Sequence, residues 1–241
     1  MEKDKFDTVL DISLQELGLE GNLLLKERLW VYMNYLIEEN KKYNLTAIER
    51  EEEIISKHFL DSLVFFTKYQ LSAGMKIIDI GTGAGFPGLV MKIYQPEVEM
   101  VLVDSLNKRI KFLNNLIERL ALPGIEALHV RSEELGRKVE YREKYNFVVS
   151  RAVAAVNILS EYTIPFTIIG GKTVFFKGPG FQKELDEGKR AVEIMGGEIT
   201  ALYNVQIPGV QGERNIVEIT KRRDTPAKYP RKPGLPKKRP L

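Results

Sequence analysis

Apolar residues recur at helical spacing in three stretches of the first 70 residues. Within each stretch the apolar side chains lie three and four positions apart, which places them on one face of an amphipathic helix. The three stripes comprise Phe6, Val9, Leu10, Leu14 and Leu17, then Leu25, Leu29, Met33, Leu36 and Ile37, and finally Ile54, Ile55, Phe59, Leu63 and Phe66. The sequence therefore predicts a helical cap over residues 1–70 that packs on the domain that follows.

From Met75 onwards, short strand-like runs alternate with helical stretches. Strands are expected at 75–80, 98–103, 125–130, 145–150, 171–177, 198–207 and 214–221, and helices at 86–95, 107–121, 132–138, 153–168 and 181–195. This alternation is typical of a mostly parallel sheet with helices on both faces. The last two strands differ, because only about six residues separate them and a parallel pair needs a crossover of a dozen or more. We therefore expect an α/β domain over residues 71–222 with an antiparallel pair at the end of its sheet.

Composition restricts the class of protein. The 241 residues are 44% hydrophobic and 29% charged, which is usual for a soluble globular protein. No apolar run approaches the roughly 18 to 20 residues of a membrane span, and the first residues lack a signal-peptide core. With no cysteine and two histidines, His58 and His129, the chain offers neither a disulfide nor an obvious metal site. A cytoplasmic protein, without a bound metal and monomeric, is expected.

Residues 223–241 form a basic, proline-rich tail. Residues 221–241 carry nine basic side chains against one acid, a net charge of +8, so the rest of the chain carries −5 of the total of +3. Five of the eleven prolines follow Thr220, and this density predicts extended chain without helix, draped over the domain or free in solvent. Such a tail is either an electrostatic contact for a polyanion or a solubilising terminus, and composition alone favours neither.

The segment from Met75 to Asp104 reads as strand, glycine loop, helix and strand, with an acid at the end. Its residues 83–88, Gly-Ala-Gly-Phe-Pro-Gly, match the dinucleotide pattern G-x-G-x-x-G, and Asp104 lies 21 residues after Gly83. A unit of this kind binds a nucleoside-containing cofactor across the carboxyl ends of its strands. The pattern by itself suits either a nicotinamide dinucleotide or S-adenosylmethionine.

Three features favour S-adenosylmethionine over the dinucleotide. Asp79 precedes the first glycine by two positions and would repel a pyrophosphate. Pro87 lacks the amide donor that a helix N-terminus would offer to phosphate. The antiparallel final strands are typical of the S-adenosylmethionine-dependent methyltransferase sheet. The expected cofactor is therefore S-adenosyl-L-methionine, and an NAD-linked oxidoreductase is disfavoured.

Several segments together resemble one known family. They are residues 57–62, 79–88, 103–109, 150–153, 177–178 and 229–234, and the similarity runs from about Asn44 to the C-terminus. These segments in this order resemble the bacterial glucose-inhibited division protein B family, whose members are small-subunit (16S) ribosomal RNA guanine-N7 methyltransferases. The resemblance implies a class I, Rossmann-like methyltransferase fold with seven strands. It also implies methylation of a specific guanine in 16S ribosomal RNA, with that RNA or the small-subunit particle as partner.

The resemblance further implies which residues bind the cofactor. The glycine loop would pass under the methionine and ribose, Asp104 would accept from the ribose hydroxyls, and the segment after the third strand would lie at the adenine. The residues concerned are Gly81, Gly83, Gly85, Phe86, Asp104, Ser132, Glu133 and Arg151. Two of them have a purely structural alternative. Asp104 could cap helix 107–121, and Glu133 could be an acid favoured by a helix dipole.

Two basic residues are the candidates for the active site. Arg151 would orient the base or the cofactor through the fork of its guanidinium, and Lys177 would contact an RNA phosphate. Guanine N7 has an in-plane lone pair and loses no proton before attack, so a general base is not needed. His58, among apolar neighbours, is either a half-buried histidine bonded to Asp61 or backbone, or it lines the mouth of the cofactor site together with Lys57, Asp61 and Ser62.

Two other functions fit the same residues. A small-molecule methyltransferase would share the sheet but would not need a polycationic tail. A non-catalytic RNA-binding protein could retain the cofactor fold without its activity. Transfer of a labelled methyl group to RNA, to a small molecule or to neither distinguishes the three.

Overall fold

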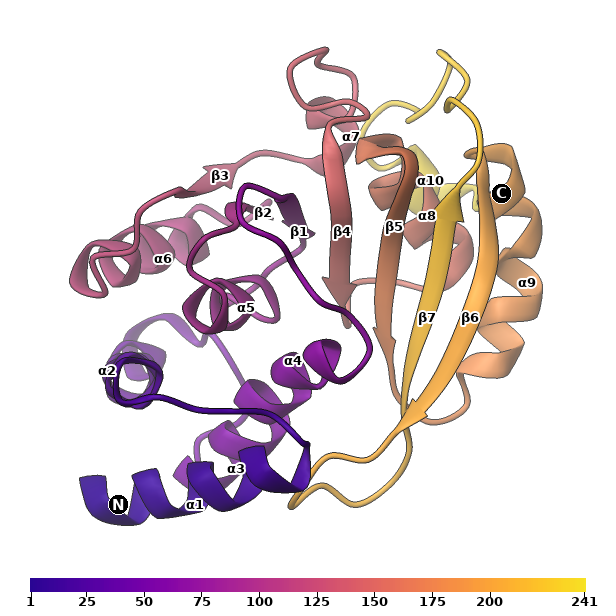
Figure 1. The fold of residues 1–241 in the computed structure, drawn as a ribbon. Helices are drawn as coiled ribbons and strands as arrows, with labels where there is room; N and C mark the ends of the chain where they lie inside the picture. Colours follow the sequence, from indigo (N-terminus) through magenta and orange to yellow (C-terminus); the bar gives the residue numbers. More distant parts are fainter.

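The computed structural model describes all residues 1–241, and its centre is one seven-stranded sheet (Figure 1). The strands are β1 (Lys76–Ile80), β2 (Glu99–Asp104), β3 (Ile125–His129), β4 (Tyr145–Arg151), β5 (Thr167–Lys177), β6 (Gly197–Val205) and β7 (Arg214–Lys221). Their order is β3-β2-β1-β4-β5-β7-β6. The first five are parallel neighbours, and β7 runs antiparallel to both β5 and β6. The predicted, mostly parallel sheet with an antiparallel last strand is confirmed.

The largest difference from the expected elements lies between residues 153 and 170. Instead of one helix to residue 168, α8 (Val156–Thr163) is followed by a 3₁₀ turn, η3 (Ile164–Phe166), and then directly by β5. Pro165 explains the early end of α8, because proline has no amide hydrogen to donate to the carbonyl four residues earlier and its ring clashes with that carbonyl. Strand β5 consequently begins four residues earlier than predicted, with Thr167 paired to Tyr145.

The first 70 residues are helical, as predicted, but the third helix is not continuous. They form α1 (Lys3–Glu16), α2 (Leu23–Tyr43), α3 (Glu51–Ile54), η1 (Ile55–Leu60), α4 (Asp61–Leu63) and η2 (Val64–Thr67). The segment η1 is a π-helix and η2 is a 3₁₀ helix. None of the chain's helices has the length and apolar composition needed to cross a membrane.

Helices cover both faces of the sheet (Figure 1). Successive residues of a strand point to opposite faces, so each face has its own buried side chains. On one face, α5 (Gly88–Tyr94) and α6 (Asn107–Arg119) share a cluster of 41 buried residues with the N-terminal helices, including Ile77 of β1. On the other face, α7 (Ser132–Leu135), α8 and α9 (Phe181–Ile194) pack in two smaller clusters, one of which includes Ile78 of β1. The N-terminal helices thus pack against the same core as the glycine-loop helix α5.

The C-terminal tail is draped over the domain and is anchored there. Arg142 donates hydrogen bonds to the carbonyls of Thr225 and Tyr229, and the Tyr229 side chain is buried. The expectation that proline excludes helix from the tail is wrong for one turn, α10 (Leu235–Lys238). Pro236 is its second residue, a position at which the missing amide hydrogen would have no helical partner in any case.

Candidate functional site

Two adjoining cavities lie where β1, β2, β4 and β5 end. The larger has a volume of about 750 Å³ and the smaller about 260 Å³, and both are lined by Gly81, Arg109, Ala152 and Val153. Of the predicted site residues, the larger cavity is lined by Gly81, Gly83, Phe86, Arg151 and Lys177, and the smaller by Gly81, Asp104, Ser132 and Glu133. Gly85 lines neither cavity. The structure therefore brings all but one of the predicted residues together.

Gly85 faces the N-terminal helices. A Cβ atom at this position would lie 2.5 Å from the hydroxyl of Tyr32, which belongs to α2 and donates a hydrogen bond to the carbonyl of Ala84. The ring of Tyr32 also stacks on that of Phe86 with centroids 5.3 Å apart. The absence of a side chain at Gly85 therefore leaves room for Tyr32, which holds the glycine loop in place. Other residues of the loop line the cavities.

Replacing Tyr32 with phenylalanine should lower the free energy of unfolding by about 1–2 kcal/mol, because the Ala84 carbonyl loses its buried donor. Tyr43→Phe is the matched control, since that side chain is exposed and makes no side-chain hydrogen bond. Chemical denaturation of the two variants measures the difference. Equal stabilities would show that the Tyr32 hydroxyl does not support the loop.

Asp79 organises the loop from beneath. Its Oδ2 accepts from the Thr82 hydroxyl at 2.7 Å and from the Gly88 amide at 2.8 Å. Burial raises the pKa of this carboxyl to about 6, and the two hydrogen bonds and the Arg151 charge oppose that shift. Asp79 is fully buried and lines neither cavity, so its carboxyl bonds the loop and does not face the ligand.

Asp104 ends β2 and lines the smaller cavity. Oδ2 accepts from the Gly83 amide and from Arg109 Nη1, both at 3.0 Å, while Oδ1 accepts only from the Leu106 amide at 2.9 Å. Leu106, not Asp104, is the N-cap of α6. Because each carboxylate oxygen can accept two hydrogen bonds, Oδ1 retains capacity for a ligand hydroxyl.

Ser132 and Glu133 form the first turn of α7 and line the smaller cavity. The Glu133 carboxylate is almost completely buried, with 3% of the residue exposed. Its Oε1 accepts from the backbone amide of Gly234 in the tail at 2.9 Å, and its Oε2 lies 3.4 Å from the Ser132 hydroxyl. Glu133 therefore connects the smaller cavity to the C-terminal tail, a contact that sequence spacing gave no sign of.

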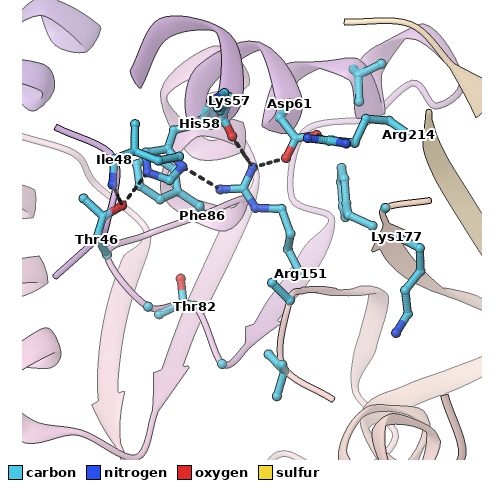
Figure 2. Close-up of a pocket in the computed structure, with 18 of the residues that line it drawn as sticks. Thr46, Ile48, Lys57, His58, Asp61, Thr82, Phe86, Arg151, Lys177 and Arg214 are labelled. Carbon is cyan, nitrogen blue, oxygen red and sulfur yellow. Dashed lines mark hydrogen bonds and ion pairs between the residues drawn. The ribbon is translucent and has the colours of Figure 1, made fainter. Parts of the chain in front are cut away.

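The guanidinium of Arg151 is clamped at the end of β4 (Figure 2). Nη1 donates to Asp61 Oδ2 and to the carbonyls of Lys57 and His58 at 3.3 and 3.5 Å, and the guanidinium carbon lies 5.2 Å from the centroid of the Phe86 ring. The carbonyls belong to the π-helix η1, a type of turn that recurs at functional sites. Asp61 also lies within 3.5 Å of Arg214 Nε across the cavity.

His58 completes this cluster but does not bond Asp61. Its Nε2 lies 2.9 Å from the Thr46 hydroxyl and its Nδ1 lies 3.4 Å from Arg151 Nη2, with its ring stacked on Phe86 at 4.2 Å (Figure 2). Because a guanidinium can only donate, Nδ1 accepts and the ring proton is assigned to Nε2. Burial, together with the charge of Arg151, lowers the pKa of His58 to about 3. The ring is thus neutral at pH 7, and both its nitrogens have partners.

The depressed pKa of His58 predicts a pH-dependent stability. A histidine in the unfolded chain has a pKa near 6.5, so below that pH the unfolded chain binds a proton at His58 that the folded chain does not bind. The free energy of unfolding therefore falls as the pH falls towards 3. On going from pH 7 to pH 5, the contribution of His58 should lower the free energy of unfolding by about 2 kcal/mol. Asp79 acts in the opposite direction, because its raised pKa favours the folded state as pH falls. Subtracting the unfolding free energies of His58→Gln from those of the unmodified chain isolates the histidine, and a difference independent of pH would contradict the prediction.

Lys177 lines the larger cavity, but its ammonium group is already bound. Nζ donates to the carbonyl of Ala154 at 2.8 Å and to Glu184 Oε2 at 2.7 Å, and the group points away from the Arg151 guanidinium (Figure 2). A role in phosphate contact stays a prediction, and it would require Glu184 to release the ammonium.

Sequence reasoning gave no role to Arg109 and Arg214, and it did not foresee the ion pairs of Asp61. Asp61 and Arg214 bracket the larger cavity with Arg151, and Arg109 lies between the two cavities. The sequence places Asp61 only at the mouth of the cofactor site, as a neighbour of His58. Arg214 begins the antiparallel strand β7, whose return to the carboxyl ends of β4 and β5 is visible only in the assembled sheet.

Comparisons with known proteins agree on the fold and the family. The profile of the GidB family, described as rRNA small subunit methyltransferase G, matches residues 25–217. The protein named ribosomal RNA small subunit methyltransferase G from Desulforamulus reducens is 45% identical over 87% of this chain and 88% of its own length. The protein of the same name from Clostridium tetani is 41% identical over 98% of this chain and 99% of its own length.

Solved structures with much lower sequence identity share the fold. A SAM-dependent methyltransferase from Aquifex aeolicus superposes with a TM-score of 0.53 at 16% identity, covering 74% of this chain and 97% of that one. A precorrin-6y C5,15-methyltransferase from Geobacter metallireducens gives 0.51 at 13% identity, over 66% and 87% of the two chains. The sheet is therefore that of the class I SAM-dependent methyltransferases, as predicted. With the family profile spanning most of the sequence, the chain belongs to the GidB family of ribosomal RNA small subunit methyltransferases.

Proposed function

We propose that this protein transfers a methyl group from S-adenosyl-L-methionine to N7 of a guanine in small-subunit (16S) ribosomal RNA. Membership of the GidB family and the names of its relatives support the reaction and the RNA. The observation that carries the proposal is the clamped guanidinium of Arg151 at the end of β4, beside the glycine loop and over the Phe86 ring. We expect the enzyme to act as a monomer in the cytoplasm.

The residues around the smaller cavity fit the adenosine part of the cofactor. Asp104 offers an acceptor for the ribose hydroxyls, and Glu133 offers a buried acceptor for an exocyclic amino group such as that of adenine. Arg109, in the lining that both cavities share, supplies a positive charge for a carboxylate such as that of the methionine part. When bound, the cofactor supplies an activated methyl group on its sulfonium sulfur.

The chain's own part in the reaction would be to position the base. Guanine N7 needs no deprotonation, and the larger cavity offers no free base. Both nitrogens of the neutral His58 are engaged, and the carboxylates of Asp61 and Glu184 are held in ion pairs. The fixed fork of Arg151 can donate to guanine O6 beside N7, while Asp61 and the π-helix carbonyls prevent it from turning away. Holding both reactants in line supplies most of the rate enhancement in such a displacement.

The charges in the larger cavity favour RNA over a small apolar substrate. Lys57, Arg109, Arg151, Lys177 and Arg214 line it against two acids, Asp61 and Glu184. Cationic side chains of this kind contact phosphates and make binding salt-dependent. To enter the cavity, the target guanine would have to be unstacked from its neighbours. A base in an RNA loop or in a partly assembled particle meets this condition.

The proposal is tested with methyl-labelled S-adenosylmethionine, the protein, and either small-subunit ribosomal RNA or small-subunit particles. Label should enter the RNA, and borohydride reduction followed by aniline treatment should cleave the chain at one guanine, because only N7 methylation weakens that ring. Label in RNA without cleavage would place the methyl group on another atom. Label only in small molecules would support a small-molecule methyltransferase, and no transfer despite RNA binding would support a non-catalytic RNA-binding protein.

A further inference from the structure

Two buried acids on different helices hold the C-terminal tail. Glu161 of α8, which is fully buried, accepts from the Arg231 amide at 2.6 Å and from its guanidinium at 2.6 to 3.0 Å in a bidentate pair. Glu133 of α7 accepts from the Gly234 amide three residues later. The tail therefore spans α8 and α7 and is fixed to each by a carboxylate.

One of these two contacts reaches the smaller cavity. Glu133 lines that cavity together with Tyr162, the neighbour of Glu161. Apart from Gly234, the only partner of the Glu133 carboxylate is the Ser132 hydroxyl at a long 3.4 Å. A nearly buried carboxylate with one strong donor takes its orientation from that donor, because an unpaired charge in this position is costly.

We propose that the tail positions Glu133 for the cofactor, with the backbone N–H of Gly234 as the positioning group and the Arg231–Glu161 pair as its anchor. The inference rests on the proposed function, in which the smaller cavity receives the adenine. It assigns the tail a role that charge alone does not supply. The tail shapes the cofactor site through a neutral amide, in addition to any contact its cations make with RNA.

The backbone of Gly234 offers a variant that tests this contact in the full-length chain. Gly234 has φ of +80°, and an added Cβ would meet nothing within 4 Å, so substitution there changes backbone strain without a side-chain clash. Valine, branched at Cβ, strongly disfavours this conformation and should move the amide away from Glu133, whereas asparagine tolerates it. Gly234→Val and Gly234→Asn are therefore a matched pair.

Isothermal titration with S-adenosylmethionine, without RNA, should give a Kd about five- to tenfold higher for Gly234→Val and within about twofold of the unmodified chain for Gly234→Asn. In a Glu133→Ala background, Gly234→Val should change the Kd no further, because the group through which it acts is gone. A purely structural role of the tail would instead give the same additional weakening in both backgrounds. Neutralising Lys237, Lys238 and Arg239 together should leave this Kd unchanged, since those side chains contact neither carboxylate.

Equal affinities of Gly234→Val and the unmodified chain would overturn the inference while leaving the proposed function intact. The inference would also be overturned if neutralising Lys237, Lys238 and Arg239 together weakened binding as much as Gly234→Val does. Failure of the unmodified chain to bind S-adenosylmethionine at all would overturn both the inference and the proposed function. The two failures are thus told apart by the unmodified protein.

Discussion

Replacing Arg151 with lysine should lower methyl transfer to ribosomal RNA by about 100-fold, the cost of a misplaced reactant in an in-line displacement. The guanidinium reaches Asp61, two π-helix carbonyls and His58 at the same time, in directions set by its plane. A lysine ammonium keeps the charge but is a single point on a flexible stem, so it cannot face both His58 and the base. Because Arg151→Lys keeps the positive charge of the cavity, a lower turnover would report the loss of orientation and not a loss of charge.

Single-turnover transfer from labelled S-adenosylmethionine, with cofactor affinity measured separately, checks this prediction. Arg190→Lys is the matched control, because Arg190 is exposed on α9, away from both cavities. Thermal unfolding should show that Arg151→Lys remains folded, since lysine still compensates the Asp61 charge. Near-normal turnover together with unchanged cofactor affinity would refute the orienting role of Arg151.

Replacing Asp104 with asparagine should weaken the binding of S-adenosylmethionine by about 10- to 100-fold, the range expected for losing hydrogen bonds to a charged acceptor. The carboxylate now accepts from the Gly83 amide, Arg109 and the Leu106 amide. An asparagine side chain must turn its NH₂ group towards one of these donors or towards the ribose hydroxyls. Either orientation removes an acceptor that the cofactor or the glycine loop needs.

Equilibrium titration of Asp104→Asn against Asp186→Asn separates this effect from a general loss of charge. Asp186 is an exposed residue of α9 paired with Lys189, so its substitution should leave cofactor affinity unchanged. An Asp104→Asn affinity within twofold of the unmodified chain would mean that the carboxylate only supports the loop and the start of α6.

The composition of the C-terminal tail indicates its charge and its mostly extended chain, but not its partners in the domain. The nine basic residues of 221–241 fitted either an electrostatic contact for a polyanion or a solubilising terminus. In the structure, Lys221, Arg222 and Arg231 form ion pairs with acids of the domain. Arg231 reaches the fully buried Glu161, 70 positions away in the chain. Proline density left open whether the extended tail would be draped over the domain or free in solvent, and which carboxylates the tail contacts depends on how α7 and α8 pack.

Local pattern was sufficient for most of the fold and for the loop. Strand alternation, the glycine loop and the acid at the end of β2 are properties of neighbouring residues, so the parallel sheet and the place of Asp104 followed from the sequence alone. Parallel strands bring their carboxyl ends to one edge, which is why Arg151 and Lys177 could be assigned to the same cavity as the glycine loop.

Only the tertiary structure decided how the side chains in that cavity are held. No periodicity in the sequence predicts the π-helix that directs two carbonyls and Asp61 towards Arg151. No residue near Glu133 in the sequence indicates its contact with Gly234. These contacts join residues 90 and 101 positions apart. Their geometry arises when separate elements pack together, so the sequence could supply the groups of the site but not the partners that orient them.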